Sequence, residues 1–381
     1  MTAAGQAPQS RPTLLRRIFQ LVTVPLVAVV GGFLVGGIVI LISSLSTGSL
    51  DPSLPLNAYA SLFQGAFGSL RGILFTIVSA APLILGGMAV GLGFKAGLFN
   101  IGAQGQFLMG ALGAAAVGAA LAGTSGFVAI PGAILAGAVL GAAWGFIPGA
   151  LKAWTGAHEV VTTIMLNFIA AAIIGYLITG PLETPGFSFS RTGPLGNAEL
   201  PTLFGTSIHL GVFIAFALVP AVWWLLWRST LGFEIRTVGA NPDAARYAGM
   251  HPALITILTM SLCGLLAGLS GAGQILGISH FMNASYGTSI GFDAISVALL
   301  GRAHPVGIML AALLFGALRA GSGLMQIQAG IPVEIIDVIQ AMVLLFLAAD
   351  VMIRRLLRVR GPRIEPDELQ TVSKTYGSGT I

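Results

Sequence analysis

The chain has 381 residues, of which 55% are hydrophobic and only 8% charged, and its mean hydropathy is +0.92. Soluble domains carry about 25% charged residues, so this composition excludes an ordinary soluble protein and indicates an all-α, polytopic membrane protein. The net charge is +5, and the C-terminal residues include a basic cluster. Membrane topology explains this cluster better than nucleic-acid binding, because the cytoplasmic flanks of membrane spans are rich in Lys and Arg.

The sequence predicts about ten hydrophobic segments. They lie at about residues 18–43, 73–94, 97–123, 127–152, 159–181, 207–227, 252–276, 292–301, 306–321 and 334–352. The segment at 292–301 is too short to cross about 30 Å of hydrocarbon at 1.5 Å per residue, so it is expected to be a broken or half-crossing helix. Gly137, Gly141, Gly145 and Gly149 recur every fourth residue and predict one closely packed helix face.

These segments predict one membrane domain at residues 18–353, with a cytoplasmic arm at 1–17 and a cytoplasmic tail at 354–381. Of the 18 Lys and Arg residues, this topology places only Arg71, Arg191 and Arg319 outside the cell. That bias agrees with the positive-inside rule, so both termini are expected in the cytoplasm. The predicted membrane domain would be surrounded by membrane lipid.

A polar loop at residues 229–252 interrupts the two apolar halves and is too charged to lie in lipid. Inside it, Asn241 is a helix N-cap, Pro242 suits the first helical position, and Gly249 suits the end of a short helix. The small side chains of Ala244, Ala245 and Ala248 predict a face that docks into a groove of a partner. The expected coupling residues are Gly239, Asn241, Pro242, Asp243, Ala244, Ala245, Arg246, Ala248 and Gly249.

Polar side chains within apolar segments are costly and therefore mark candidate function. The candidate translocation path comprises Asn100, Gln104, Gln106, Glu159, Thr163, Asn167, Asp293 and Ser296. Three of them, at 159, 163 and 167, share one helix face. Amides and hydroxyls with phenylalanines nearby suit a neutral, polyhydroxylated or heteroaromatic solute, and no chain of buried carboxylates suggests an ion pump. The structural alternative is that these groups hold helices together.

The sequence holds no signature of an ATP-hydrolysing or metal-dependent enzyme. Its lysines are Lys95, Lys152 and Lys374, and none ends a G-x-x-x-x-G-K-[ST] phosphate-binding loop. Cys263 is the only cysteine, and the five histidines are too scattered for a metal site. We expect no catalytic, cofactor or metal residues, so ATP hydrolysis must belong to a partner.

Two other functions fit single features of the chain. Gly268 to Gly271 reads GLSG, which is similar to the G-x-S-G of intramembrane serine proteases, with Ser270 as nucleophile and His280 or His304 as base. A stand-alone secondary transporter would also place polar residues at broken helices between two halves.

Four motifs in order, GLFNIGAQGQ, EVVTTIMLN, GFEIRTVGANPDAARYAGM and GFDAISVALLGRAHPVG, resemble the permease of branched-chain amino acid and simple-sugar ABC importers. The resemblance covers about residues 70–352 and is nearest to the nucleoside, or basic membrane lipoprotein-linked, uptake systems. It implies a type II-like permease fold with broken helices, related to the cobalamin-type importers, in the bacterial inner membrane.

The same resemblance implies the partners and the solute. It implies a second homologous permease, forming a heterodimer, separate ABC ATPase subunits, and an extracytoplasmic substrate-binding protein or lipoprotein. It places the coupling segment on residues 239–250. Nucleosides are the implied solute, and simple sugars or branched-chain amino acids are the alternatives; transport would follow alternating access.

Overall fold

The computed structural model describes residues 14–45, 51–203 and 206–348 of the chain. Within these ranges regular structure is helical, with no named strand, as the sequence predicts. The α-helices are α1 (Leu14–Ser44), α2 (Leu54–Phe67), α3 (Leu70–Lys95), α4 (Ala103–Ala120), α5 (Gly126–Thr155), α6 (Glu159–Ile178), α7 (Leu210–Arg228), α8 (Thr230–Ala240), α9 (Pro242–Tyr247), α10 (Pro252–Gln274), α11 (Ile290–Leu300), α12 (Pro305–Ala329) and α13 (Ile335–Ala348). A 3-10 turn, η2 (Gly196–Ala198), and a π-helical turn, η3 (Ile275–Ser279), complete it. The predicted tail at 354–381 lies outside the described residues.

Seven of these helices, α1, α3, α5, α6, α7, α10 and α12, are long and apolar enough to cross a membrane. Each of the ten expected segments overlaps a helix, but α4 does not meet both requirements and α11 and α13 are shorter. The all-α membrane fold is therefore confirmed, whereas the count of about ten segments is not. The short α11 agrees with the expected broken helix.

The structure moves the end of one expected segment, and with it the position of Arg319 along its helix. The segment expected to end near residue 321 continues as α12 to Ala329. Arg319, which the expected topology placed at the outer end of this segment, therefore lies well before the end of α12. The sequence pattern misleads here because glycines and polar residues near 321–328 look like a helix end, while packing extends the helix.

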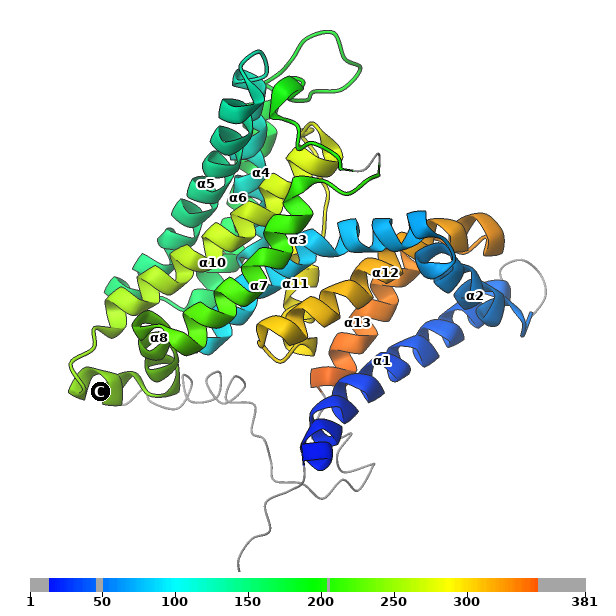
Figure 1. Cartoon of the computed structure of the whole chain (residues 1–381), viewed down its shortest axis with the longest axis horizontal. Coiled ribbons are helices and arrows are strands. Elements are labelled where there is room, and N and C mark those ends of the chain that lie inside the picture. Colours follow the sequence, from blue (N-terminus) through cyan, green and yellow to red (C-terminus); the bar gives the residue numbers. More distant parts are fainter. Residues whose placement is uncertain (1–13, 46–50, 204–205, 349–381) are drawn as a thin grey trace, which may run out of the picture.

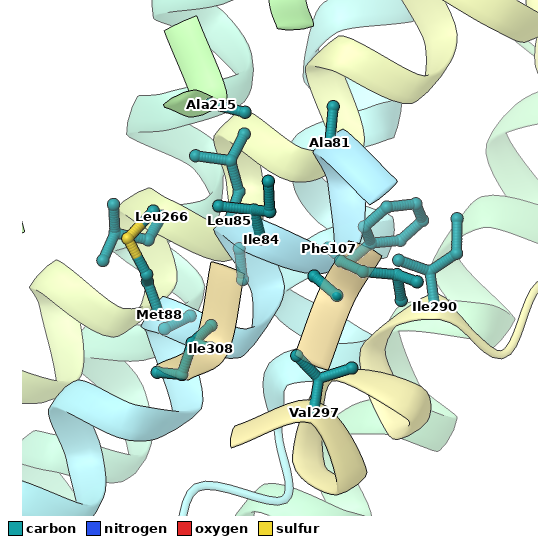
Figure 2. Packing of buried hydrophobic residues seen from close by; sticks show 14 of the residues in the cluster. Ala81, Ile84, Leu85, Met88, Phe107, Ala215, Leu266, Ile290, Val297 and Ile308 are labelled. Carbon is teal, nitrogen blue, oxygen red and sulfur yellow. The ribbon is translucent and has the colours of Figure 1, made fainter. Parts of the chain in front are cut away.

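The helices form two groups joined by α3 (Figure 1). In one group α10 packs against α5 and α4, and in the other α12 packs against α2 and α3 while α1 packs against α13. The helix α3 contacts members of both groups and is the most buried of the seven spans. Figure 2 shows its Ile84, Leu85 and Met88 among apolar side chains from other helices, including Leu266 of α10 and Ile308 of α12.

The contact between α5 and α10 is made by glycines, as the repeat in α5 predicts. Added Cβ atoms on Gly141 and Gly145 would run into the backbone of Gly264 on α10. A Cβ on Gly149 would lie 2.8 Å from Cβ of Met260. Between two helices in lipid there is no water to expel, so close backbone approach supplies the attraction.

We predict that Gly141→Val disrupts this contact. Its side chain has no room against Gly264, so we expect overpacking of roughly 1–3 kcal/mol and a lower unfolding midpoint in detergent. The matched control is Gly175→Val in α6, where an added Cβ meets nothing within 4 Å. Equal unfolding midpoints for the two variants would contradict the proposed role of the glycine face.

Candidate functional site

The predicted helix of the polar loop is present as α9. Asn241 caps it, with Oδ1 accepting hydrogen bonds from the backbone N–H of Asp243 and Ala244, both at 3.0 Å. Pro242 occupies the first turn. Gly249 has φ +83°, a left-handed conformation that costs glycine least, and it lets the chain turn into α10. Sequence and structure agree here because every signal is local.

The structure divides the small-residue face of α9. Ala245 is fully buried against its own chain, whereas Ala244 and Ala248 are exposed. The residue between them that sequence reasoning missed is Tyr247, whose side chain is 94% exposed. A fully exposed aromatic beside small residues and Arg246 has the composition of an interface anchor. The remaining coupling residues, Asn241, Pro242, Asp243, Arg246 and Gly249, are also exposed.

A second helix, α8, precedes α9 and was not predicted. The sequence signal that could have revealed this helix is Ser229, a residue type favoured at N-caps. Its Oγ accepts a hydrogen bond from the N–H of Gly232 at 3.0 Å. Gly239 of α8 sits against the backbone of Lys95 and Ala96, where α3 ends, so closely that a Cβ would clash. The predicted coupling residue Gly239 is thus a docking point between α8 and α3.

The two breaks in the apolar pattern, residues 96–102 and 280–289, meet through Gln104. Its Nε2 donates to the carbonyl of Thr288 at 2.7 Å, and its Oε1 accepts from the N–H of Gly291 at 2.9 Å. Gln104 is nearly buried. One side chain of α4 therefore satisfies the backbone at the start of α11, a group that lipid could not satisfy.

The other amides form similar bonds. Asn100 and Gln106 pair through both amide groups, at 2.9 and 3.2 Å. Asn167 of α6 accepts from the N–H of Gly105 at 2.7 Å and donates to the carbonyl of Ile101 at 3.1 Å. All three are buried. These contacts tie α4 and the preceding break to α6.

The remaining members of the predicted path lie nearer the helix ends or between helices. Glu159 forms a salt bridge with Lys152 of α5, with Nζ to Oε2 at 2.6 Å. Thr163 is fully buried, and its hydroxyl donates to the carbonyl of Val160 at 3.1 Å. Ser296 is buried in α11. The partner Lys152 was not predicted, because a residue at the end of one span gives no sequence sign of its neighbour.

Asp293 in α11 pairs with Arg319 in α12, and Ser289 contacts both. The Ser289 hydroxyl donates to Asp293 Oδ2 at 3.1 Å, and Arg319 donates directly to the same carboxylate oxygen. Side-chain exposure is 13% for Asp293 and 28% for Arg319. This charge pair fastens the half-helix to a full-length helix. Sequence reasoning found the carboxylate but not its arginine.

Residues 179–203, 206–209 and 280–289 lie at the opposite end of α5, α7 and α10 from α9 (Figure 1), and we term them the distal end. There His209 is buried, and burial together with the nearby His280 lowers the pKa of His209 to about 4. Its ring fills the space beside Gly277 of η3. His209 therefore packs at this end of the molecule.

The family of branched-chain amino acid transport system permease components matches residues 72–348. The chain belongs to this permease family. Over 90% of its length it is 37% identical to the guanosine ABC transporter permease protein NupP of Bacillus subtilis, 97% of which is covered. It is 36% identical to the nucleoside ABC transporter permease protein NupB of Lactococcus lactis, with 88% and 93% covered. It is 34% identical to the glucose ABC transporter permease protein TsgB13 of Haloferax volcanii, with 87% and 88% covered.

The permease is a multi-pass subunit of an ABC importer and not an enzyme. The geometry agrees, because Ser270, the residue considered as a protease nucleophile, is fully buried and its hydroxyl donates to the carbonyl of Pro82 at 2.7 Å. It joins α10 to α3. The predicted family is thus confirmed, and Ser270 has a structural explanation.

We predict that Arg319→Met destabilises the permease by about 3 kcal/mol, because it leaves Asp293 buried without its cation. The double variant Asp293→Asn with Arg319→Met removes the uncompensated charge and should recover most of the loss. Thermal unfolding in detergent, followed for both variants, measures the difference. A double variant as unstable as Arg319→Met would contradict pairing as the role of Asp293.

Proposed function

We propose that the permease carries nucleosides across the bacterial cytoplasmic membrane into the cell, with both termini on the cytoplasmic side. The observation that supports this solute is the near full-length similarity to guanosine and nucleoside permeases of two different bacteria. The uncharged amides and hydroxyls at the broken helices suit a neutral solute with a ring and several hydroxyl groups. Simple sugars are the second candidate, because the glucose permease of Haloferax volcanii is 34% identical.

The working importer is proposed to contain a second, homologous permease. The chain is 28% identical to NupQ of Bacillus subtilis and 26% identical to NupC of Lactococcus lactis, the second nucleoside permeases of the organisms that also have NupP and NupB. That pattern favours a heterodimer with the translocation path between its halves. An extracytoplasmic substrate-binding protein or lipoprotein would deliver the solute at the distal end.

We propose that the ABC ATPase binds α9. Ala244 and Ala248 are small and exposed, and Tyr247 projects almost completely into the surroundings. Small residues allow close approach of a groove, while an aromatic side chain fills a pocket, so this surface suits a protein partner. Movement of α9 would then drive alternating access in the two permeases.

The proposed solute is tested by uptake into proteoliposomes that hold the intact assembly and its binding protein. We expect labelled guanosine to accumulate only with ATP inside the compartment that the ATPase faces, and excess ribose to leave the rate unchanged. Uptake that persists without ATP, or by the permease alone, would point to a secondary transporter. Inhibition by ribose but not by nucleosides would favour the sugar alternative.

The proposed coupling surface is tested by Ala248→Trp. A bulky ring on this exposed position should block docking of the ATPase groove and lower guanosine uptake at least about tenfold, while the permease still folds and inserts. Ala248 is preferable to Ala245, whose enlargement would disturb the packing of the permease itself. The control is Ala171→Trp, an exposed position on α6. Wild-type uptake by Ala248→Trp would remove α9 from the mechanism.

A further inference from the structure

At the distal end, α10 changes into the π-helical turn η3 (Ile275–Ser279), and this change brings two polar side chains together. The N–H of His280 donates to the carbonyl of Ile275 at 2.8 Å, and His280 has φ 60° as the turn ends. Residues five apart do not face each other on an α-helix, but the wider turn places Gln274 beside Ser279. The Gln274 Nε2 donates to Ser279 Oγ at 3.5 Å.

A third polar group joins them from the following segment. The hydroxyls of Ser279 and Tyr286 lie 3.2 Å apart. All three side chains are partly exposed, unlike the residues of the predicted path, which are mostly buried. Gly273, next to Gln274, faces open space, since an added Cβ would meet nothing within 4 Å. We call Gln274, Ser279 and Tyr286 the distal subsite.

The segment that carries Tyr286 is held at both ends. Before it, Met282 exchanges hydrogen bonds with Thr192, at 2.9 and 3.0 Å, which fixes the segment to the distal end. After it, Thr288 and Gly291 bind Gln104 on α4. Tyr286 therefore lies between the Met282–Thr192 contact and the start of the half-helix α11.

The chemistry of the distal subsite selects a class of solute. Its groups are neutral, and each can both donate and accept hydrogen bonds. Partly exposed polar groups at the end of a membrane span are not satisfied by lipid, so they face water or a polar molecule. Tyr286 adds an aromatic ring beside two groups that match sugar hydroxyls.

We propose that the distal subsite contacts the solute as it leaves the binding protein, with the ribose hydroxyls on Gln274 and Ser279 and the base against Tyr286. This assignment rests on the proposed function. It makes Tyr286 a specificity-determining residue, because a two-ring purine offers more stacking surface than a one-ring pyrimidine.

The test compares initial uptake of guanosine and cytidine by the intact assembly in proteoliposomes. Tyr286→Leu removes the ring and should lower guanosine uptake roughly five- to tenfold and cytidine uptake only about twofold, so that the ratio of the two rates falls. Tyr286→Phe keeps the ring and should keep the ratio. Gln274→Leu, which affects the shared ribose, should lower both rates by a similar factor.

The matched control is Tyr176→Leu, which removes a 73% exposed tyrosine on α6 and should leave both rates unchanged. ATPase activity without solute, measured on every variant, reports whether the assembly is intact. An unchanged guanosine-to-cytidine ratio in Tyr286→Leu overturns the distal subsite, whether both rates stay normal or fall together. If Tyr286→Leu fails to assemble, a wild-type guanosine rate in Gln274→Leu overturns it.

Uptake by the wild-type assembly tests the proposed function separately from the distal subsite. A wild-type assembly that takes up ribose but neither nucleoside overturns both the proposed solute and the subsite. A wild-type assembly that takes up nucleosides, combined with insensitive variants, overturns the subsite alone.

Discussion

Backbone groups in hydrocarbon must find partners within the protein, and this constraint governs the centre of the permease. Two stretches of irregular backbone, residues 96–102 and 280–289, interrupt the helices. Within hydrocarbon, each unsatisfied N–H or carbonyl would cost several kcal/mol. Gln104 and Asn167 supply the missing partners through amides that donate on one side and accept on the other. Gln104 satisfies backbone groups at the start of the broken helix α11, and Asn167 those at the start of α4.

Because these amides bind groups within the chain, they are poorly placed to bind a solute as well. A side chain whose donor and acceptor are both engaged within the chain has little left to offer a passing molecule. Asn100 and Gln106 bind each other through both amide groups, and both are buried. A path between two permeases needs polar surface that one chain leaves accessible. In the described part of the chain, the Gln274, Ser279 and Tyr286 group has that property.

Sequence reasoning succeeded where the signal was local and failed where a partner came from elsewhere. The cap at Asn241 and the turn at Gly249 depend on neighbouring residues, and α9 forms as predicted. The family follows from four ordered motifs. The pairing of Arg319 with Asp293 was missed because nothing near either residue in the sequence reveals the other. The helix α8 was missed because charged residues in a loop conceal an amphipathic helix whose buried face packs on α7, α10 and the end of α3.

The contact between α8 and α3 bears on the proposed coupling, because it links the α8–α9 unit to α3. Gly239 holds α8 against Lys95 and Ala96 without an intervening side chain, so the two backbones cannot shift independently. The break that begins at Ala96 leads within a few residues to Gln104, which holds the start of α11. A displacement of the α8–α9 unit would therefore reach the half-helix through backbone contacts and one amide. The close approach leaves no room for a Cβ at position 239, and this is a physical reason for glycine at that position.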